Sequence, residues 1–284
     1  CLFVTPTLRL FLLTALTMLA FAGNSLLNRA ALAGDLIGPS GFAMIRVIAG
    51  AVVLALLVWR RDRRWADLAE VSWKSTGALA LYVLGFSHAY IWLDAGIGAL
   101  FLFGGVQITM FAGALIGGER PSPQRWAGAV LAFGGLVLLL APSTNAPSLL
   151  GAGLMLAAAF GWGMYSLYGR QVKRPLQATA GNFLLAVPIA LIVGWSVPDA
   201  MPATSPGVVL AVLSGAVTSG LGYALWYTIL PRLVATLAAV AQLTVPVIAA
   251  AGGALLLAEF PGFSFLIASV LVLGGVALSV WRKT

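Results

Sequence analysis

Side chains that could do chemistry are few in this sequence, and most of them lie inside long apolar stretches. They comprise two asparagines with helical i, i+4 spacing, two isolated glutamines, the only histidine and one arginine: Asn24, Asn28, Gln107, Gln242, His88 and Arg46. A polar group within an apolar span is costly to bury, so each is a candidate functional residue. Amides and an imidazole can hydrogen-bond a bound molecule, which points to a binding site.

Aromatic residues share helical faces with small residues in two further stretches. One face carries Ala158, Gly161, Trp162 and Tyr165, and the other carries Ser219, Gly222, Tyr223 and Trp226. Glycine lets a ligand approach the backbone, while aromatic rings provide flat apolar walls with one hydrogen-bonding atom. Trp92 lies four positions after His88 and so shares its helical face. Such stripes predict a cavity for an aromatic solute, although small and aromatic residues also pack helix against helix.

Catalytic and cofactor patterns are missing. The sequence has no second histidine, no paired carboxylates and no nucleophile elbow, and Cys1 is its only cysteine. It contains no phosphate-cradling G-x-x-x-x-G-K-[ST] segment. We therefore expect neither an enzyme nor a cofactor or metal site, and we expect no direct use of ATP.

The composition is that of an integral membrane protein. Hydrophobic residues make up 61% of the chain and charged residues 8%, far from the values of a soluble domain. A bilayer core needs about 20 apolar residues per helix, so 284 residues accommodate ten spans. The predicted spans are 10–32, 39–59, 75–94, 97–117, 125–141, 149–170, 178–196, 207–230, 233–256 and 263–281. The expected fold class is thus all-α, because lipid offers backbone amides no partner.

An internal repeat organises these spans. From Lys74, about sixty residues recur at an offset of 140, so that Gly118-Glu119-Arg120-Pro121 returns as Ala258-Glu259-Phe260-Pro261 and Gly134-Gly135 as Gly274-Gly275. Each unit has five spans, an odd number, so the second copy enters the membrane from the opposite side. The predicted units are residues 1–141 and 142–284, two inverted repeats around a site at the midplane.

Charge fixes the expected orientation. If both termini are cytoplasmic, 14 of the 16 basic residues fall inside, namely Arg9, Arg60, Arg61, Arg63, Arg64, Lys74, Arg120, Arg125, Arg170, Lys173, Arg174, Arg232, Arg282 and Lys283. The outer connections hold Asp35, Asp94, Asp199 and Glu259 and no Lys or Arg. This split predicts a multi-pass protein of a bacterial-type inner membrane. Because the basic residues lie in short loops, the pI near 10.3 does not indicate a nucleic-acid partner.

The sequence resembles the drug/metabolite transporter superfamily, in particular its ten-helix EamA-type permeases. The resemblance rests on the repeated Glu-x-Pro and Gly-Gly motifs, on Arg46 in the second span, and on the Tyr-Ser-Leu-Tyr-Gly-Arg ending of the sixth. The chain looks most like the aromatic amino-acid exporters of the YddG type. The resemblance implies a central cavity lined by helices 1, 3, 4, 6, 8 and 9.

Several residues allow more than one interpretation of their role. His88 is a solute or proton site, or a histidine bonded to a neighbouring helix. Arg46 is a gate latch, a carboxylate anchor, or half of a structural pair with Asp35, Asp94 or Asp199 and a snorkelling side chain. Gln107 and Gln242 contact solute or join helices. Pro188 and Pro246 are hinges or static bends.

The sequence therefore predicts an exporter of amino acids, aromatic ones above all, that works by alternating access with membrane lipid as its other partner. Asn24, His88, Trp92, Gln107 and Gln242 would join Trp162, Tyr165, Tyr223 and Trp226 as substrate-binding residues. Both halves lie in one chain, so a monomer suffices. The alternatives are a carrier of a purine, a sugar nucleotide or a lipophilic drug, and a membrane-embedded scaffold or enzyme.

Overall fold

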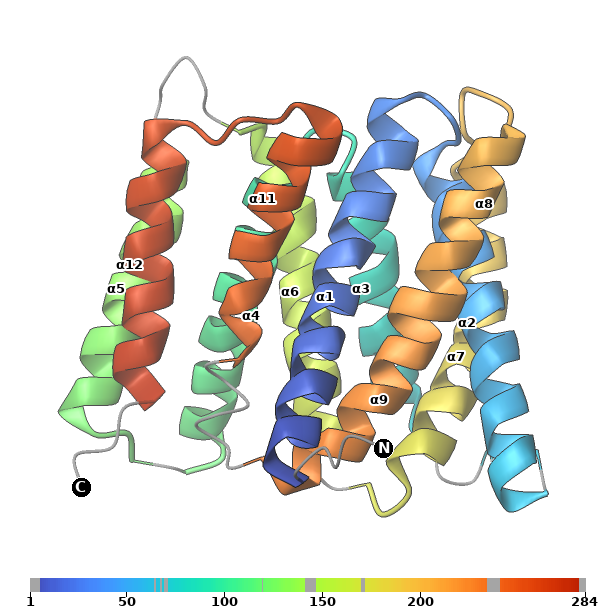
Figure 1. Ribbon diagram of the computed structural model, residues 1–284, viewed down its shortest axis with the longest axis horizontal. Coiled ribbons are helices and arrows are strands. Elements are labelled where there is room, and N and C mark those ends of the chain that lie inside the picture. Colours follow the sequence, from blue (N-terminus) through green and yellow to red (C-terminus); the bar gives the residue numbers. More distant parts are fainter. Residues whose placement is uncertain are drawn as a thin grey trace.

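The computed structural model describes residues 6–280 except 64, 67, 69–70, 119, 141–146, 170–171 and 234–240. Every regular element within these residues is helical (Figure 1). Cys1, Glu119 of the repeated motif and the first part of the expected ninth span lie outside the described residues. The helices are α1 (Pro6–Ala33), α2 (Pro39–Asp62), α3 (Trp73–Ala89), α4 (Ala95–Ile116), α5 (Pro123–Leu139), α6 (Leu149–Gly169), α7 (Pro175–Ser196), α8 (Ser205–Leu213), η2 (Ser214–Leu221), α9 (Gly222–Ile229), η3 (Leu230–Arg232), α11 (Thr244–Leu257) and α12 (Phe263–Val280).

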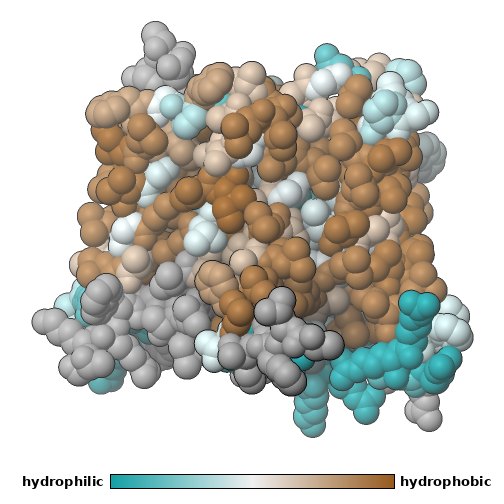
Figure 2. Space-filling model, in the orientation of Figure 1, coloured by the Kyte–Doolittle hydropathy of each residue, from teal (hydrophilic) through white to brown (hydrophobic). Residues whose placement is uncertain are grey.

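These elements form ten spans within the described residues, because α8, η2 and α9 follow one another as a single rod. Six helices are both long and apolar enough to cross a bilayer, and α11 and α12 are shorter apolar helices. Apolar side chains cover most of the face seen in Figure 2 between the two ends of the molecule. Among them are Phe11, Ile116, Trp195 and Leu255, each at least two-thirds exposed. The chain is an all-α, multi-pass membrane protein, as the composition predicted.

The two ends differ in charge. We call basic end the one where α1 begins and α12 ends, at the bottom of Figure 1. Teal side chains collect there below α2 (Figure 2), whose last turn holds Arg60 and Arg61. We call acidic end the opposite one, where the connections carry Asp35, Asp94, Asp199 and Glu259.

The two halves pack with twofold symmetry. α12 packs against α5, α11 against α4 and α7 against α2, so each of these helices contacts its own counterpart in the other repeat. The neighbouring contacts correspond as well, because α3 packs on α6 just as α8–α9 packs on α1. α5 rises from the basic end, whereas α12 descends toward it (Figure 1). The predicted inverted repeat is thus the arrangement of the fold.

The repeated Gly-Gly motif explains the α5–α12 contact. A Cβ on Gly135 would lie 2.9 Å from Leu271 Cβ and 3.0 Å from the Ala268 carbonyl oxygen of α12, and a Cβ on Gly275 would lie 2.5 Å from the Gly128 carbonyl oxygen of α5. A Cβ on Gly134 or Gly274 would meet nothing within 4 Å. The second glycine of each pair therefore lets the helices approach, as small residues do in membranes.

The eighth span departs from the prediction of one regular helix over 207–230. Ser214–Leu221 is π-helical and separates α8 from α9. π segments are rare and occur often at functional sites. The expected ninth span also differs, because residues 241–242 are helical, Leu243 is in a turn and α11 begins at Thr244. Pro246 lacks the N–H that would bond residue 242, so the helix is interrupted there. Pro188 lies inside the continuous α7.

Candidate functional site

A central cavity lies among the helices of both repeats. Its lining comes from α1, α3, α4, α6 and α9: Phe21, Asn24, Tyr82, Phe86, Leu102, Phe103, Trp162 and Tyr223. The cavity volume is about 10 Å³, which is room for a single water molecule. A cavity of this size has no room for a solute larger than water.

Aromatic rings form most of the cavity wall. The Trp162 ring centroid is 4.8 Å from that of Tyr82 and 4.9 Å from that of Tyr223. Phe21 meets Trp162 edge-on at 6.3 Å and Trp226 at 5.9 Å. Separations and tilts of this kind are favourable for aromatic pairs. These rings come from both repeats.

One hydroxyl group organises the polar side of the cavity. The Tyr82 hydroxyl accepts hydrogen bonds from Asn24 Nδ2 at 3.3 Å and from Arg46 Nη2 at 3.0 Å, and it lies 3.2 Å from the Tyr223 hydroxyl. Asn24 Oδ1 in turn accepts from Ser214 at 2.6 Å and from Thr218 at 3.2 Å. All six side chains are buried. The network joins α1, α2 and α3 to η2 and α9, and thus one repeat to the other.

Arg46 is completely buried and has no carboxylate partner within the described residues. Its Nε donates to the Ser219 hydroxyl at 3.1 Å, and its guanidinium lies 4.8 Å from the centroid of the Phe86 ring and 5.3 Å from that of Tyr82. Nη1 is buried without a hydrogen-bond partner. The expected pair with an acidic residue of the outer rim is therefore wrong, and so is the snorkelling side chain. Hydroxyls and ring faces surround the charge instead, because the side chain lies inside the bundle.

The π segment positions the groups around Arg46. It places Ser214, Thr218 and Ser219 on the side that faces α1 and α2. Gly215 permits the close approach, because a Cβ there would collide with the carbonyl oxygen of Arg46. Serine and threonine hydroxyls bond side chains across helices at this point, a common way of joining membrane helices.

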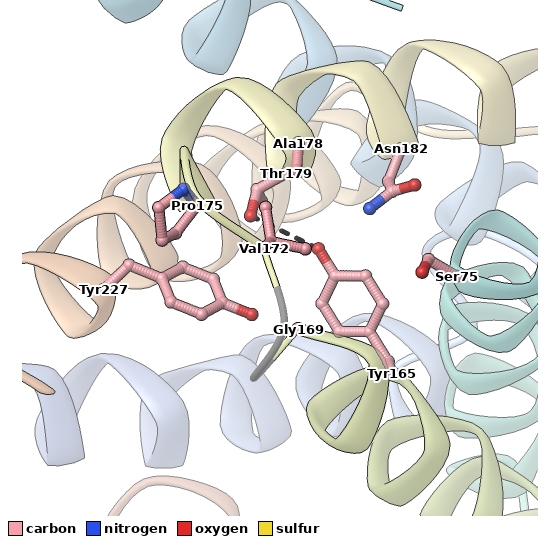
Figure 3. Close-up of a pocket in the computed structure, with 9 residues that line it drawn as sticks. All are labelled: Ser75, Tyr165, Gly169, Val172, Pro175, Ala178, Thr179, Asn182 and Tyr227. Carbon is pink, nitrogen blue, oxygen red and sulfur yellow. Dashed lines mark hydrogen bonds between the residues drawn. The ribbon is translucent and has the colours of Figure 1, made fainter. Parts of the chain in front are cut away.

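A second pocket lies nearer the basic end, between α3, α6, α7 and α9. Figure 3 shows Tyr165 at its centre, with its hydroxyl bonded to Thr179 at 3.3 Å and Tyr227, Asn182 and Ser75 around it. Trp162, one turn from Tyr165, lines the central cavity, and the two ring centroids are 5.7 Å apart. This aromatic pair separates the two spaces, so a movement of Trp162 and Tyr165 would connect the cavity with the basic end.

Ionic contacts close the acidic end. Arg29 of α1 bonds Glu259 Oε1 at 2.5 Å and Asp94 Oδ1 at 3.3 Å, and it donates to the carbonyl oxygens of Tyr90 and Ile91. Glu259 Oε2 accepts from the Ala95 N–H at the start of α4 at 2.8 Å. We call this set the Arg29 cluster; it joins α1 and the α3–α4 connection to the α11–α12 connection of the other repeat.

A second contact between the repeats lies at the same end. Asp199, between α7 and α8, accepts from the N–H groups of Ser40 and Gly41 at 3.0 and 2.7 Å. These amides lie in the first turn of α2, where the helix dipole favours a carboxylate. The Ser40 hydroxyl donates to the Val197 carbonyl oxygen at 2.7 Å and lies 3.3 Å from His88 Nε2. His88 therefore takes part in closing the acidic end.

The structure distributes seven of the nine predicted substrate-binding residues over three places. Asn24, Trp162 and Tyr223 line the central cavity, Trp226 contacts it through Phe21, and Tyr165 lines the second pocket. His88, bonded to the Leu84 carbonyl oxygen at 2.9 Å, lies at the acidic end, and Trp92, 41% exposed, lies beside Gly151 there. Gln107 is half-buried in α4 and Gln242 just before α11. Neither glutamine lines the two pockets.

Sequence reasoning missed residues on two helices. On α3 it followed the face of His88, whereas the cavity receives the aromatic stripe Tyr82 and Phe86, whose i, i+4 spacing was a usable signal. On α1 it passed over Phe21 and Arg29. An arginine inside an apolar helix is costly, and that cost was the signal for Arg29.

Comparison with known proteins agrees with this fold. A family model described as the EamA-like transporter family matches residues 149–281. An uncharacterized protein of Pseudomonas aeruginosa is 48% identical over 96% of this chain and 95% of its own length. The chain belongs to the EamA-like transporter family. It is accordingly a transporter of small solutes.

Two further likenesses extend over most of the chain. A protein of Escherichia coli K12 named "Probable amino-acid metabolite efflux pump" is 29% identical over 73% of this chain and 76% of its own. A solved crystal structure superimposes with a TM-score of 0.68 over 95% of this chain and 96% of that one, at 19% identity. That structure supports the fold alone.

Proposed function

We propose that this transporter exports amino acids, aromatic ones in particular, across a bacterial-type inner membrane with both termini in the cytoplasm. The observation that carries the proposal is the central cavity, whose walls are the rings of Phe21, Tyr82, Phe86, Phe103, Trp162 and Tyr223. Flat rings at several tilts suit an aromatic side chain. Asn24 and the hydroxyls beside it provide hydrogen bonds for polar groups.

The mechanism we propose is alternating access of the two halves. The Arg29 cluster and the Asp199 contact close the acidic end, which is the outer one in this orientation. The Trp162–Tyr165 pair closes the path toward the basic end. Opening one closure while the other holds moves a solute through the cavity, as in other carriers built of inverted repeats. One chain holds both closures, so it works as a monomer.

Relatives support the solute class in part. The Escherichia coli relative is named an amino-acid metabolite efflux pump. A protein of Rhizobium johnstonii named "Riboflavin transporter" is 27% identical over 63% of this chain and 58% of its own. Both names describe small solutes, and riboflavin carries a flat ring system.

Reconstitution in liposomes tests the proposal. Efflux of labelled phenylalanine, tyrosine, tryptophan, alanine and riboflavin is measured with and without a pH gradient. We expect the aromatic amino acids to leave fastest, and Trp162→Ala to slow them more than Phe160→Ala, a lipid-facing control that is 53% exposed. Flux of riboflavin, a purine or a sugar nucleotide without flux of any aromatic amino acid would reject the proposal. Flux independent of the gradient would exclude a proton-coupling role for His88.

A further inference from the structure

We propose that Arg46 is the anion-binding residue of the central site, so that a solute is recognised by its carboxylate and not by its ammonium group. The inference rests on the proposed function, because it defines the chemical class that the same site accepts. It follows from the hydrogen-bond partners of one buried side chain and from the charges around it.

The guanidinium group is only partly satisfied by the protein. Nε bonds Ser219 and Nη2 bonds Tyr82, whereas Nη1 is buried without a partner. Buried polar atoms are nearly always hydrogen-bonded, and an unpaired donor on a charged group is a costly exception. Nη1 is therefore a charged donor without a protein partner. Arg46 itself does not line the cavity, but its guanidinium lies against Tyr82 and Phe86, which do.

The chain also leaves the charge of Arg46 unneutralised within its described residues. The ion pairs there involve Arg29 and Arg61, and Asp199 is bonded to the amides of α2. Three further acidic residues of the sequence, Asp67, Glu70 and Glu119, lie outside the described residues. A buried ion is stabilised chiefly by an opposite charge. The site thus carries a net positive charge that a bound anion would neutralise.

The position of Arg46 joins this charge to the aromatic walls. Its guanidinium lies over Phe86 and Tyr82, and both residues line the cavity. Once the rings separate to admit a solute, an anionic group beside Tyr82 comes within reach of the guanidinium. Arginine binds carboxylates through paired N–H donors. The aromatic body of the same solute would then lie against Trp162 and Tyr223.

The cavity lacks a matching group for a cation. None of its lining residues is acidic, and the Asn24 amide oxygen already accepts two hydrogen bonds. An ammonium group would therefore meet the positive charge of Arg46 without a compensating carboxylate. The arrangement accepts aromatic solutes that carry a carboxylate, amino acids among them, and it disfavours the corresponding amines.

Three probes of one shape separate these contributions: L-phenylalanine, 3-phenylpropionate and phenethylamine. Each competes with labelled phenylalanine in proteoliposomes, and each is added to the detergent-purified chain while its melting temperature is measured. We expect 3-phenylpropionate to compete at least as well as phenylalanine and phenethylamine to be about 30-fold weaker or more, since an unpaired buried charge costs that much at an interface. Equal competition by the amine and the acid would overturn the inference.

Variants supply a second test. Arg46→Gln should abolish the preference for the acid over the amine, and the melting temperature without solute should not fall, because an uncompensated buried charge is removed. Arg61→Gln is the matched control; it also removes an arginine, but one that is 71% exposed and pairs with Asp62 at the basic end, and it should leave the preference intact. A preference that survives Arg46→Gln contradicts the inference.

The two proposals fail in different ways. If no aromatic amino acid is transported, the export proposal falls, while stabilisation by 3-phenylpropionate and not by phenethylamine would still support the anion site. If phenylalanine is transported and phenethylamine competes equally, the anion site falls and the export proposal stands.

Discussion

Removing the charge of Glu259 should open the acidic end. Glu259 Oε1 is 2.5 Å from Arg29 Nε, and the two side chains are 12% and 16% exposed. A hydrogen bond to a charged group is worth about 1.5–3 kcal/mol. Glu259→Gln keeps the shape and can still accept from Ala95, so we expect a loss of about 1.5 kcal/mol from the closed state. That corresponds to an open population about tenfold higher.

Asp94→Asn is the matched control, because it removes the other carboxylate bonded to Arg29. That contact is longer, 3.3 Å, and Asp94 is 45% exposed, so solvent screens it. An exposed pair contributes about 0.5 kcal/mol, which predicts an open population only about twofold higher.

A single cysteine reports the opening. Ala249 of α11 is fully buried, and Ala249→Cys in a Cys1→Ser background should react with a membrane-impermeant maleimide at a rate proportional to the open population. We expect Glu259→Gln to raise that rate more than Asp94→Asn does. Equal rates for the two variants, or no increase with Glu259→Gln, would refute the assignment of the Arg29 cluster as the closure.

Three other substitutions test particular contacts. Gly135→Ala should lower the melting temperature because its Cβ presses on α12, whereas Gly134→Ala, which meets open space, should raise it slightly through helix propensity; equal effects would contradict the packing. Tyr82→Phe should destabilise the chain by about 2 kcal/mol and Tyr223→Phe by about 1 kcal/mol, measured by denaturation in detergent. The Tyr82 hydroxyl bonds three side chains, whereas the Tyr223 hydroxyl bonds one. A larger effect of Tyr223→Phe would contradict the role of Tyr82. His88→Gln should leave solute preference in competition assays unchanged, because its contacts are Ser40 and Leu84; an altered preference would place it in the binding site.

The sequence allowed the spans and their symmetry to be predicted because both depend on local pattern. A bilayer requires long apolar runs, and close packing of α5 on α12 requires glycine at Gly135 and Gly275. These requirements act on neighbouring residues, so one sequence is enough to predict them. Which glycine of each pair makes the contact could not be predicted, because that depends on which face of the helix meets the partner helix.

The polar contacts were harder to predict because they join distant segments. Arg29 meets Glu259 across 230 positions of the sequence, and Arg46 meets Ser219 across 173. The π segment could not be predicted for a different reason, because its residues Ser214–Leu221 fit an ordinary α-helix equally well. Gly215 of this segment packs closely on the backbone of Arg46, a contact between distant segments that the sequence does not indicate.

The size of the central cavity has a consequence for the cell. A space of about 10 Å³ has room for about one water molecule and is therefore too small for a hydrated sodium ion. Under the proposed mechanism, each passage of a solute then needs a rearrangement of the protein, and the frequency of that rearrangement should set the throughput.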